Sequence, residues 1–107
     1  MNRIEERFKQ LRNSGEKAFI PFVTAGDPTL QRTREIVLAL DEAGCDVVEL
    51  GIPFSDPLAD GAVNQEAAMR ALKHDVWLGE ILDMVREVRQ TSEVPLMLFT
   101  YYNPVLA

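Results

Sequence analysis

The chain has 107 residues, of which 47% are hydrophobic and 26% charged, and its 11 basic and 17 acidic side chains give a formal net charge of -6. This composition is typical of a folded globular domain and excludes a disordered or fibrous chain. Acidic residues are spread from end to end and leave no basic patch, so neither nucleic acid nor an anionic membrane surface is expected as a partner.

The compartment is predicted from three further features. No apolar stretch approaches the roughly 20 residues of a membrane-spanning helix, and no apolar signal segment is present. Cys45 is the single cysteine and has no partner for an internal disulfide. We therefore expect no membrane contact and a location in the reducing cytoplasm.

A short helix is expected at the start of the chain. Ile4, Phe8 and Leu11 are spaced to lie on one helical face, and the Asn-Ser-Gly run at 13–15 then ends the pattern. A leading helix is therefore predicted before the first strand.

The apolar run at 18–24 has the length of a strand and lacks strict alternation, which favours a strand covered on both faces. Pro21 weakens this prediction, because proline has no N–H to donate to a sheet ladder. After the run, Asp27 and Pro28 predict the N-cap and the first residue of the next helix.

That helix is predicted over 30–40 and is followed by Gly44, which stands where a left-handed C-terminal cap is usual. A second strand is expected over 46–50. The helix over 30–40 is predicted from apolar or small side chains at helical spacing: Leu30, Thr33, Ile36, Val37 and Leu40.

Two more helices and a third strand complete the predicted elements. Ala67, Ala68, Ala71 and Leu72 indicate a small-residue helix after a loop at 51–61. Asp75 is placed to cap a further helix that carries acids early and arginines late, matching the helix dipole. The last strand is predicted over 96–101. The apolar positions of the further helix are Ile81, Leu82, Val85 and Val88.

This order predicts two consecutive βαβ units, hence an α/β fold with a parallel sheet and right-handed crossovers. Alternation along the second strand places Val48 and Leu50 toward the helices, and Val47 and Glu49 on the opposite face, which no predicted helix covers. Residues 1–107 are therefore expected to form a single partial domain. They belong to a larger barrel, or they self-associate to hide that face and the strand edges.

Two carboxylates are the candidate chemical groups. Glu49 interrupts an apolar run, where a charged side chain is costly to bury without a partner. Asp60 follows a loop stiffened by Pro53 and Pro57, so the two acids could converge on one small ligand. On the residues alone, Glu49 could equally be held by a lysine or backbone donors at a strand end, and Asp60 could be a helix N-cap.

A metal site is not predicted. Asp27, Asp56 and Asp60 supply oxygen ligands, but their spacing matches no compact cation-binding loop. Cys45 is expected to be a small buried apolar residue, because no histidine base lies near it in the sequence.

Three segments carry a resemblance to a known family. The run from Glu49 to Gly61, ELGIPFSDPLADG, closely resembles the signature of tryptophan synthase alpha subunits. The run PFVTAGDP at 21–28 is similar to that family's first strand and loop, and YYNP at 101–104 to the end of its third strand. The resemblance covers essentially the whole chain. It implies a TIM (β/α)8 barrel, of which this chain carries about the first three βα units and the leading helix.

The resemblance also implies an activity in tryptophan biosynthesis. The alpha subunit is a carbon-carbon lyase that cleaves indole-3-glycerol phosphate by a retro-aldol reaction into indole and glyceraldehyde 3-phosphate. The subunit itself needs no cofactor. Its partner is a beta subunit that carries pyridoxal phosphate, and the two form an alpha2-beta2 tetramer.

Carried over by position, the family's site residues fall into three groups. Glu49 matches the general acid/base, and Asp60 matches the carboxylate that accepts the indole N–H. The remaining matches line the indole pocket, at Phe22, Phe99 and Tyr101, or meet the beta subunit, at Pro53, Asp56 and Asn103. On composition alone each of the three aromatic residues would be a core residue.

The chemistry fits these residue types. Cleavage needs a proton delivered to indole C3 and a proton removed from the side-chain hydroxyl, and one carboxyl with a raised pKa can serve both steps. Positive charge develops on the indole nitrogen, and an ionised carboxylate stabilises it. We therefore expect Glu49 to have a raised pKa and Asp60 to stay charged.

Two alternatives remain at this point. TIM barrels frequently hold a substrate phosphate in loops after strands seven and eight, which these residues do not include, so the 107-residue piece alone is expected to be inactive. It could be a catalytically silent segment that self-associates. It could also belong to another phosphate-binding barrel lyase, because a fold does not fix its chemistry.

Overall fold

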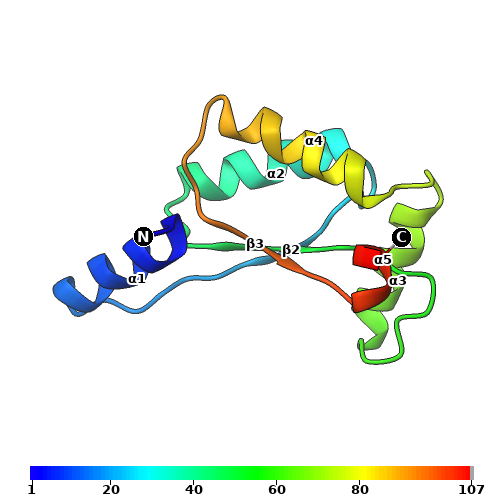
Figure 1. Cartoon of the computed structure of the whole chain (residues 1–107), viewed down its shortest axis with the longest axis horizontal. Coiled ribbons are helices and arrows are strands. Elements are labelled where there is room, and N and C mark those ends of the chain that lie inside the picture. Colours follow the sequence, from blue (N-terminus) through cyan, green and yellow to red (C-terminus); the bar gives the residue numbers. More distant parts are fainter. Residues whose placement is uncertain (107) are drawn as a thin grey trace.

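The computed structural model describes residues 1–106 and contains one three-stranded parallel sheet with the strand order β1-β2-β3 (Figure 1). This confirms the two βαβ units predicted from the sequence. The strands are β1 (Phe22–Thr24), β2 (Val48–Gly51) and β3 (Leu96–Phe99), and the helices are α1 (Arg3–Ser14), α2 (Leu30–Glu42), α3 (Ala62–Leu72), α4 (Leu78–Arg89) and α5 (Tyr102–Leu106).

Helices α1 and α2 end as their glycines predict. Gly15 caps α1 with φ of 71°, and its N–H donates to the carbonyls of Arg12 and Leu11. Gly44 follows α2 with φ of 93°, and the next N–H, of Cys45, donates to the Leu40 carbonyl at 3.1 Å. Both glycines adopt the left-handed conformation that is costly for other residues.

The cap predicted for α2 is wrong. Thr29 is the N-cap, and its hydroxyl accepts from the Arg32 N–H at 3.1 Å. The Asp27 carboxylate is occupied elsewhere, since the Arg70 guanidinium of α3 donates to both of its oxygens at 2.8 and 3.0 Å. A paired carboxylate is not free to cap a helix.

Strand β1 is shorter and more exposed than predicted. Residues 18–20 are exposed and lie outside the strand, so the expectation of a strand over 18–24 covered on both faces is wrong. Pro21 accepts from the Glu49 N–H at 2.9 Å but has no N–H to return. Further back, the Phe19 N–H donates to the Asp46 carboxylate at 2.7 Å, so a side chain replaces a rung of the ladder.

The C-terminal part contains two further differences. Asp75 does not cap α4: it lies in a turn with φ of 52°, and Trp77 is the N-cap without a side-chain hydrogen bond. Strand β3 ends at Phe99, and a short helix, α5, follows where the sequence predicted the strand to continue to Tyr101.

The core lies between the sheet and the two long crossover helices. In Figure 1, α2 and α4 run side by side over one face of the sheet. Val48 and Leu50 of β2 are fully buried there, in one apolar cluster with Val37, Ile81 and Val88. The predicted alternation of side chains along β2 is thus confirmed on this face.

The opposite face is covered only at its amino end. Val47 is 1% exposed, so the expectation that no element covers this side is wrong at that position. Helix α1 lies at that end of the strands (Figure 1), where Arg7 donates to the Cys45 carbonyl at 3.3 Å. Farther along, Phe22, Met97 and Phe99 are between 38% and 53% exposed.

Within residues 1–106 the structure has no helix that is both long and apolar enough to cross a bilayer.

Candidate functional site

The carboxyl ends of the three strands point toward α3 and α5 (Figure 1) and enclose a small cavity. Four residues proposed from the sequence for catalysis or substrate binding line it: Phe22, Asp60, Phe99 and Tyr101. Its volume of about 20 Å³ is room for roughly one water molecule. The remaining lining residues are Thr24, Gly51, Ile52, Pro53, Asn64 and Ala68.

Two aromatic rings form one side of this cavity. Phe22 of β1 and Phe99 of β3 meet edge to face, with ring centroids 5.7 Å apart and an interplanar angle of 89°. Within the described residues, 38% of the Phe22 surface and 53% of the Phe99 surface are exposed. Within residues 1–106 the two rings thus form one exposed edge-to-face pair beside the cavity.

Gly51 is a site residue that the sequence reasoning did not identify. It lies in register between Thr24 and Phe99, on the same face as the aromatic rings. A Cβ added at Gly51 would lie 2.5 Å from Cζ of Phe22, closer than real contacts allow. The absence of a side chain at Gly51 therefore leaves the space that the Phe22 ring occupies.

Glu49 lies on the same face of the sheet, two residues before Gly51, which lines the cavity. It is in register with Phe22 and Met97, and in a parallel sheet such partners project to the same side. The side chain is half-buried but does not line the cavity. Among residues 1–106 its carboxylate has no hydrogen-bond or ion-pair partner, so the lysine or backbone donors of the alternative reading are not found there.

Asp60 lines the cavity from the loop between β2 and α3. The N-cap of α3 is Gly61, so the reading of Asp60 as a helix cap is wrong. Its main-chain N–H donates to the Pro57 carbonyl at 3.1 Å. Within the described part of the chain its carboxylate makes no hydrogen bond or ion pair, and it is free to accept one from a ligand.

The three residues proposed as partner contacts separate into two groups. Pro53 and Asn103 line one groove of about 510 Å³, whereas Asp56 is exposed and lies outside its lining. This groove is mostly apolar, and its walls include Phe54, Trp77 and Leu82. Pro53 also lines the small cavity, so the groove and the cavity are neighbours.

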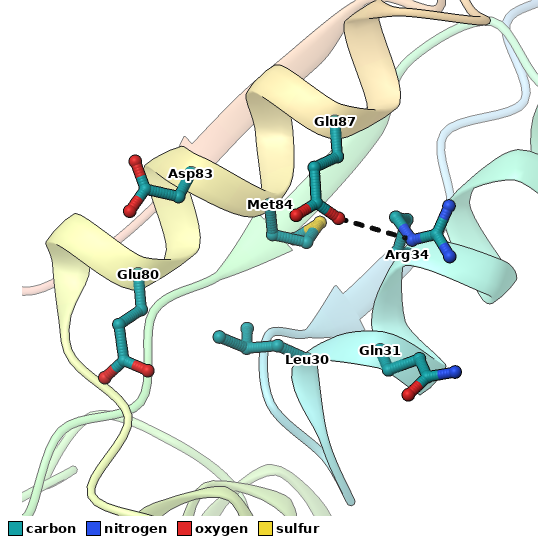
Figure 2. A pocket seen from close by; sticks show the side chains of 7 residues that line it. All are labelled: Leu30, Gln31, Arg34, Glu80, Asp83, Met84 and Glu87. Atoms are coloured by element: carbon teal, nitrogen blue, oxygen red, sulfur yellow. Dashed lines mark ion pairs between the residues drawn. The ribbon is translucent and has the colours of Figure 1, made fainter.

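A second groove, of about 430 Å³, lies between α2 and α4 and contains none of the proposed site residues. Figure 2 shows Glu80 and Asp83 on the α4 side, with Glu87 directed toward Arg34 of α2. That ion pair joins Glu87 and Arg34 at 3.5 Å. Its side chains tie two surface helices together, away from the strand ends.

Neither a metal centre nor a cysteine nucleophile is found among residues 1–106. No group of three histidine, cysteine or acidic residues there is placed to hold a metal ion. Cys45 is buried as predicted, and this burial, helped by Asp41 and Asp46, raises the pKa of its thiol. A protonated, enclosed thiol is a poor nucleophile.

The family model described as tryptophan synthase alpha chain matches residues 8–107. The chain is 55% identical over 105 residues to the tryptophan synthase alpha chain of Synechocystis and 50% identical over 105 residues to that of Caldanaerobacter subterraneus. Both alignments cover 98% of this chain and 40% of the relative. The chain thus spans about two fifths of the length of the curated relatives that it matches.

Solved structures give the same result. The alpha subunit of tryptophan synthase from Legionella pneumophila strain Paris superimposes with a TM-score of 0.96 at 44% identity, over 99% of this chain and 41% of that one. A chain of the tryptophan synthase complex from Pyrococcus furiosus superimposes with a TM-score of 0.78 at 50% identity, over 83% of this chain and 37% of that one.

Proposed function

Because the chain belongs to the tryptophan synthase alpha chain family, we propose that the protein acts in tryptophan biosynthesis, cleaving indole-3-glycerol phosphate into indole and glyceraldehyde 3-phosphate. Its fold is that of the first three βα units of a TIM (β/α)8 barrel. The observation that carries the proposal is the cavity at the strand ends, which Asp60 and three aromatic side chains line next to the sheet face that bears Glu49.

In this proposal Glu49 acts first as an acid and then as a base. Its carboxyl gives a proton to indole C3, and its carboxylate then removes the proton from the side-chain hydroxyl next to the ring. The bond from C3 to the glycerol chain breaks, the hydroxyl carbon becomes an aldehyde, and the electron pair returns to the indole ring. The absence of a basic partner for Glu49 within residues 1–106 supports this role, because a carboxyl tied to a lysine or arginine holds a proton poorly.

Asp60 is proposed to stabilise the charge that this sequence of steps creates. Protonation at C3 places positive charge on the indole nitrogen, whose N–H then donates to the Asp60 carboxylate. Phe22, Phe99 and Tyr101 are proposed to hold the ring. Two properties support these roles: the Asp60 carboxylate is unpaired within the described residues, and all three aromatic residues line the same cavity as Asp60.

We also propose that the groove lined by Pro53 and Asn103, together with Asp56 of the same loop as Pro53, meets a tryptophan synthase beta subunit. The solved complex from Pyrococcus furiosus supports this partner. The pyridoxal phosphate belongs to that beta subunit in an alpha2-beta2 tetramer, and no residue of this chain is assigned to it. A cytoplasmic location is proposed from the lone, buried Cys45.

The test is made in a full-length chain, meaning a chain of the relatives' length that carries residues 1–107. Glu49→Gln keeps the size of the side chain but cannot exchange the proton, and we expect a loss of indole release of about a hundred- to ten-thousand-fold. Indole release is followed from indole-3-glycerol phosphate at saturating concentration.

Glu42→Gln is the matched control, because Glu42 is an exposed glutamate at the end of α2. It should release indole at the wild-type rate. An unchanged rate for Glu49→Gln would remove Glu49 from the mechanism. A wild-type protein that cleaves other sugar phosphates but not indole-3-glycerol phosphate would favour a different lyase.

A further inference from the structure

The loop that carries Asp60 is fastened to α3 by one side chain. The Gln65 amide, one turn into α3, donates from Nε2 to the Pro57 carbonyl at 3.1 Å and to the Asp60 carbonyl at 2.9 Å. Both N–H groups of one amide are thus used on the two ends of a four-residue segment. The Asp60 N–H also donates to the Pro57 carbonyl at 3.1 Å, which closes the segment as a turn.

The same loop is fastened to the end of β3 from its other side. The Tyr101 hydroxyl accepts from the Ala59 N–H at 2.8 Å. The Tyr101 ring packs against Phe54, with ring centroids 5.3 Å apart, so the hydroxyl is held in place by its own ring. Residues 57–60 are therefore bound between α3 and the end of β3.

These contacts fix the main chain of Asp60 and leave its carboxylate available. None of these four hydrogen bonds uses the Asp60 side chain, which lines the cavity. We propose that Gln65 and Tyr101 are positioning residues that together set the place of the Asp60 carboxylate over the indole nitrogen. This inference rests on the proposed function.

The effect is expected mainly in the rate of the chemical step. A carboxylate displaced by about 1 Å can lower a rate by roughly a hundredfold, since charge stabilisation depends on distance and direction. Gln65 is half-buried in the first turns of α3 and is not a member of the apolar core cluster. Loss of its amide therefore loosens one loop and leaves the packing intact.

The experiment uses Gln65→Met in the full-length chain, because methionine keeps the length of the side chain and removes both donors. We expect kcat to fall about ten- to a hundredfold while KM changes little. Gln31→Met, at an exposed position of α2, is the matched control and should keep the wild-type kcat.

A double variant separates positioning from a general structural effect. If Gln65 acts through Asp60, then Gln65→Met should cost nearly nothing further in an Asp60→Asn background. The same fold-loss in both backgrounds would overturn the inference, as would a wild-type kcat for Gln65→Met.

Hydrogen exchange gives a readout that does not depend on the reaction. The Ala59 amide should exchange faster in Tyr101→Phe, which keeps the ring and removes the acceptor, and the amides of residues 58–60 should exchange faster in Gln65→Met. Unchanged exchange in both variants would overturn the inference even in an active enzyme. A wild-type protein that releases no indole would instead count against the proposed function, and exchange would still decide whether the loop is held in this way.

Discussion

The two faces of strand β2 differ in burial and in the polarity of their side chains. On one face Val48 and Leu50 are fully buried against α2 and α4. On the other, Glu49 is half-buried and stands between Phe22 and Met97, both of which are 38–39% exposed. Successive residues of one strand thus serve packing and, in our proposal, chemistry.

This contrast shows how a parallel strand can carry a carboxylate at low cost. The helix-covered face supplies the apolar burial that stabilises the sheet, so the other face need not be fully apolar. In a barrel the second face points inward, toward the strands that complete it. The exposed aromatic side chains around Glu49 are therefore what a barrel interior shows when only three strands are seen.

The largest effect is expected from a pair of neighbouring substitutions in the full-length chain. Leu50→Ala should lower the free energy of unfolding by about 2–5 kcal/mol, because it leaves a cavity among Val37, Ile81 and Val88. Glu49→Gln, one residue away, should change it by only about 0.5 kcal/mol while abolishing most activity. Urea denaturation measures the change in stability, and kcat per folded molecule measures the change in activity.

Equal losses of stability in both variants would contradict the separation of the two faces. A lower kcat per folded molecule in Leu50→Ala would also contradict this separation, because Leu50 is expected to affect stability alone.

A smaller effect is expected where the two faces meet, at the end of β2. Gly51→Ala places a methyl group 2.5 Å from Cζ of Phe22 and forces that ring out of its place. The cost should be about 1 kcal/mol of stability, at the low end of overpacking because the displaced atoms are the far end of the Phe22 ring, together with a higher KM for the substrate. Denaturation and steady-state kinetics measure the two changes.

Phe22→Leu offers a rescue, since its shorter side chain leaves room for the added methyl group. The double variant Gly51→Ala, Phe22→Leu should recover part of the stability. If Gly51→Ala were as stable as the wild type, glycine would not be needed to seat the ring.

The smallest effect is expected from the buried thiol of Cys45, which precedes strand β2. Burial, with Asp41 and Asp46 nearby, raises the pKa of Cys45, so the folded protein holds this proton to higher pH than the unfolded chain. The stability that this provides is present below the ordinary thiol pKa of about 8.5 and is lost as pH rises beyond it. Urea denaturation from neutral to alkaline pH should show this decline, and Cys45→Ala should reduce it.

Alkylation provides the second measurement for Cys45. Iodoacetamide should react far more slowly with the folded protein than with the chain in urea. Equal rates at neutral pH would show that the thiol is neither buried nor protonated as described.

Most of the fold could be predicted because its signals are local or periodic. Apolar spacing located α2 and α4, and the left-handed glycines located the ends of α1 and α2. The errors arose where a distant group decided the outcome. Asp27 is a good N-cap by composition, but Arg70, 43 residues later, pairs with its carboxylate instead.

The candidate site could be predicted only in part, because some of its contacts join residues that are distant in the sequence. The aromatic residues and Asp60 were proposed through a family resemblance, and the structure brings them around one cavity. Gly51 and Gln65 were missed, because the need for glycine depends on the Phe22 ring of another strand and the role of Gln65 depends on two carbonyls of a loop. No local pattern in the sequence contains either contact.

Trp77, which caps α4 and lines the groove that holds Pro53 and Asn103, has an optical consequence. It is the single tryptophan of the 107 residues and is 63% exposed. The tryptophan fluorescence of this segment therefore originates at the proposed docking groove, away from the cavity that Asp60 lines. Emission from this one indole reports on the solvent at the groove, without a label and without interference from a second fluorophore of its kind.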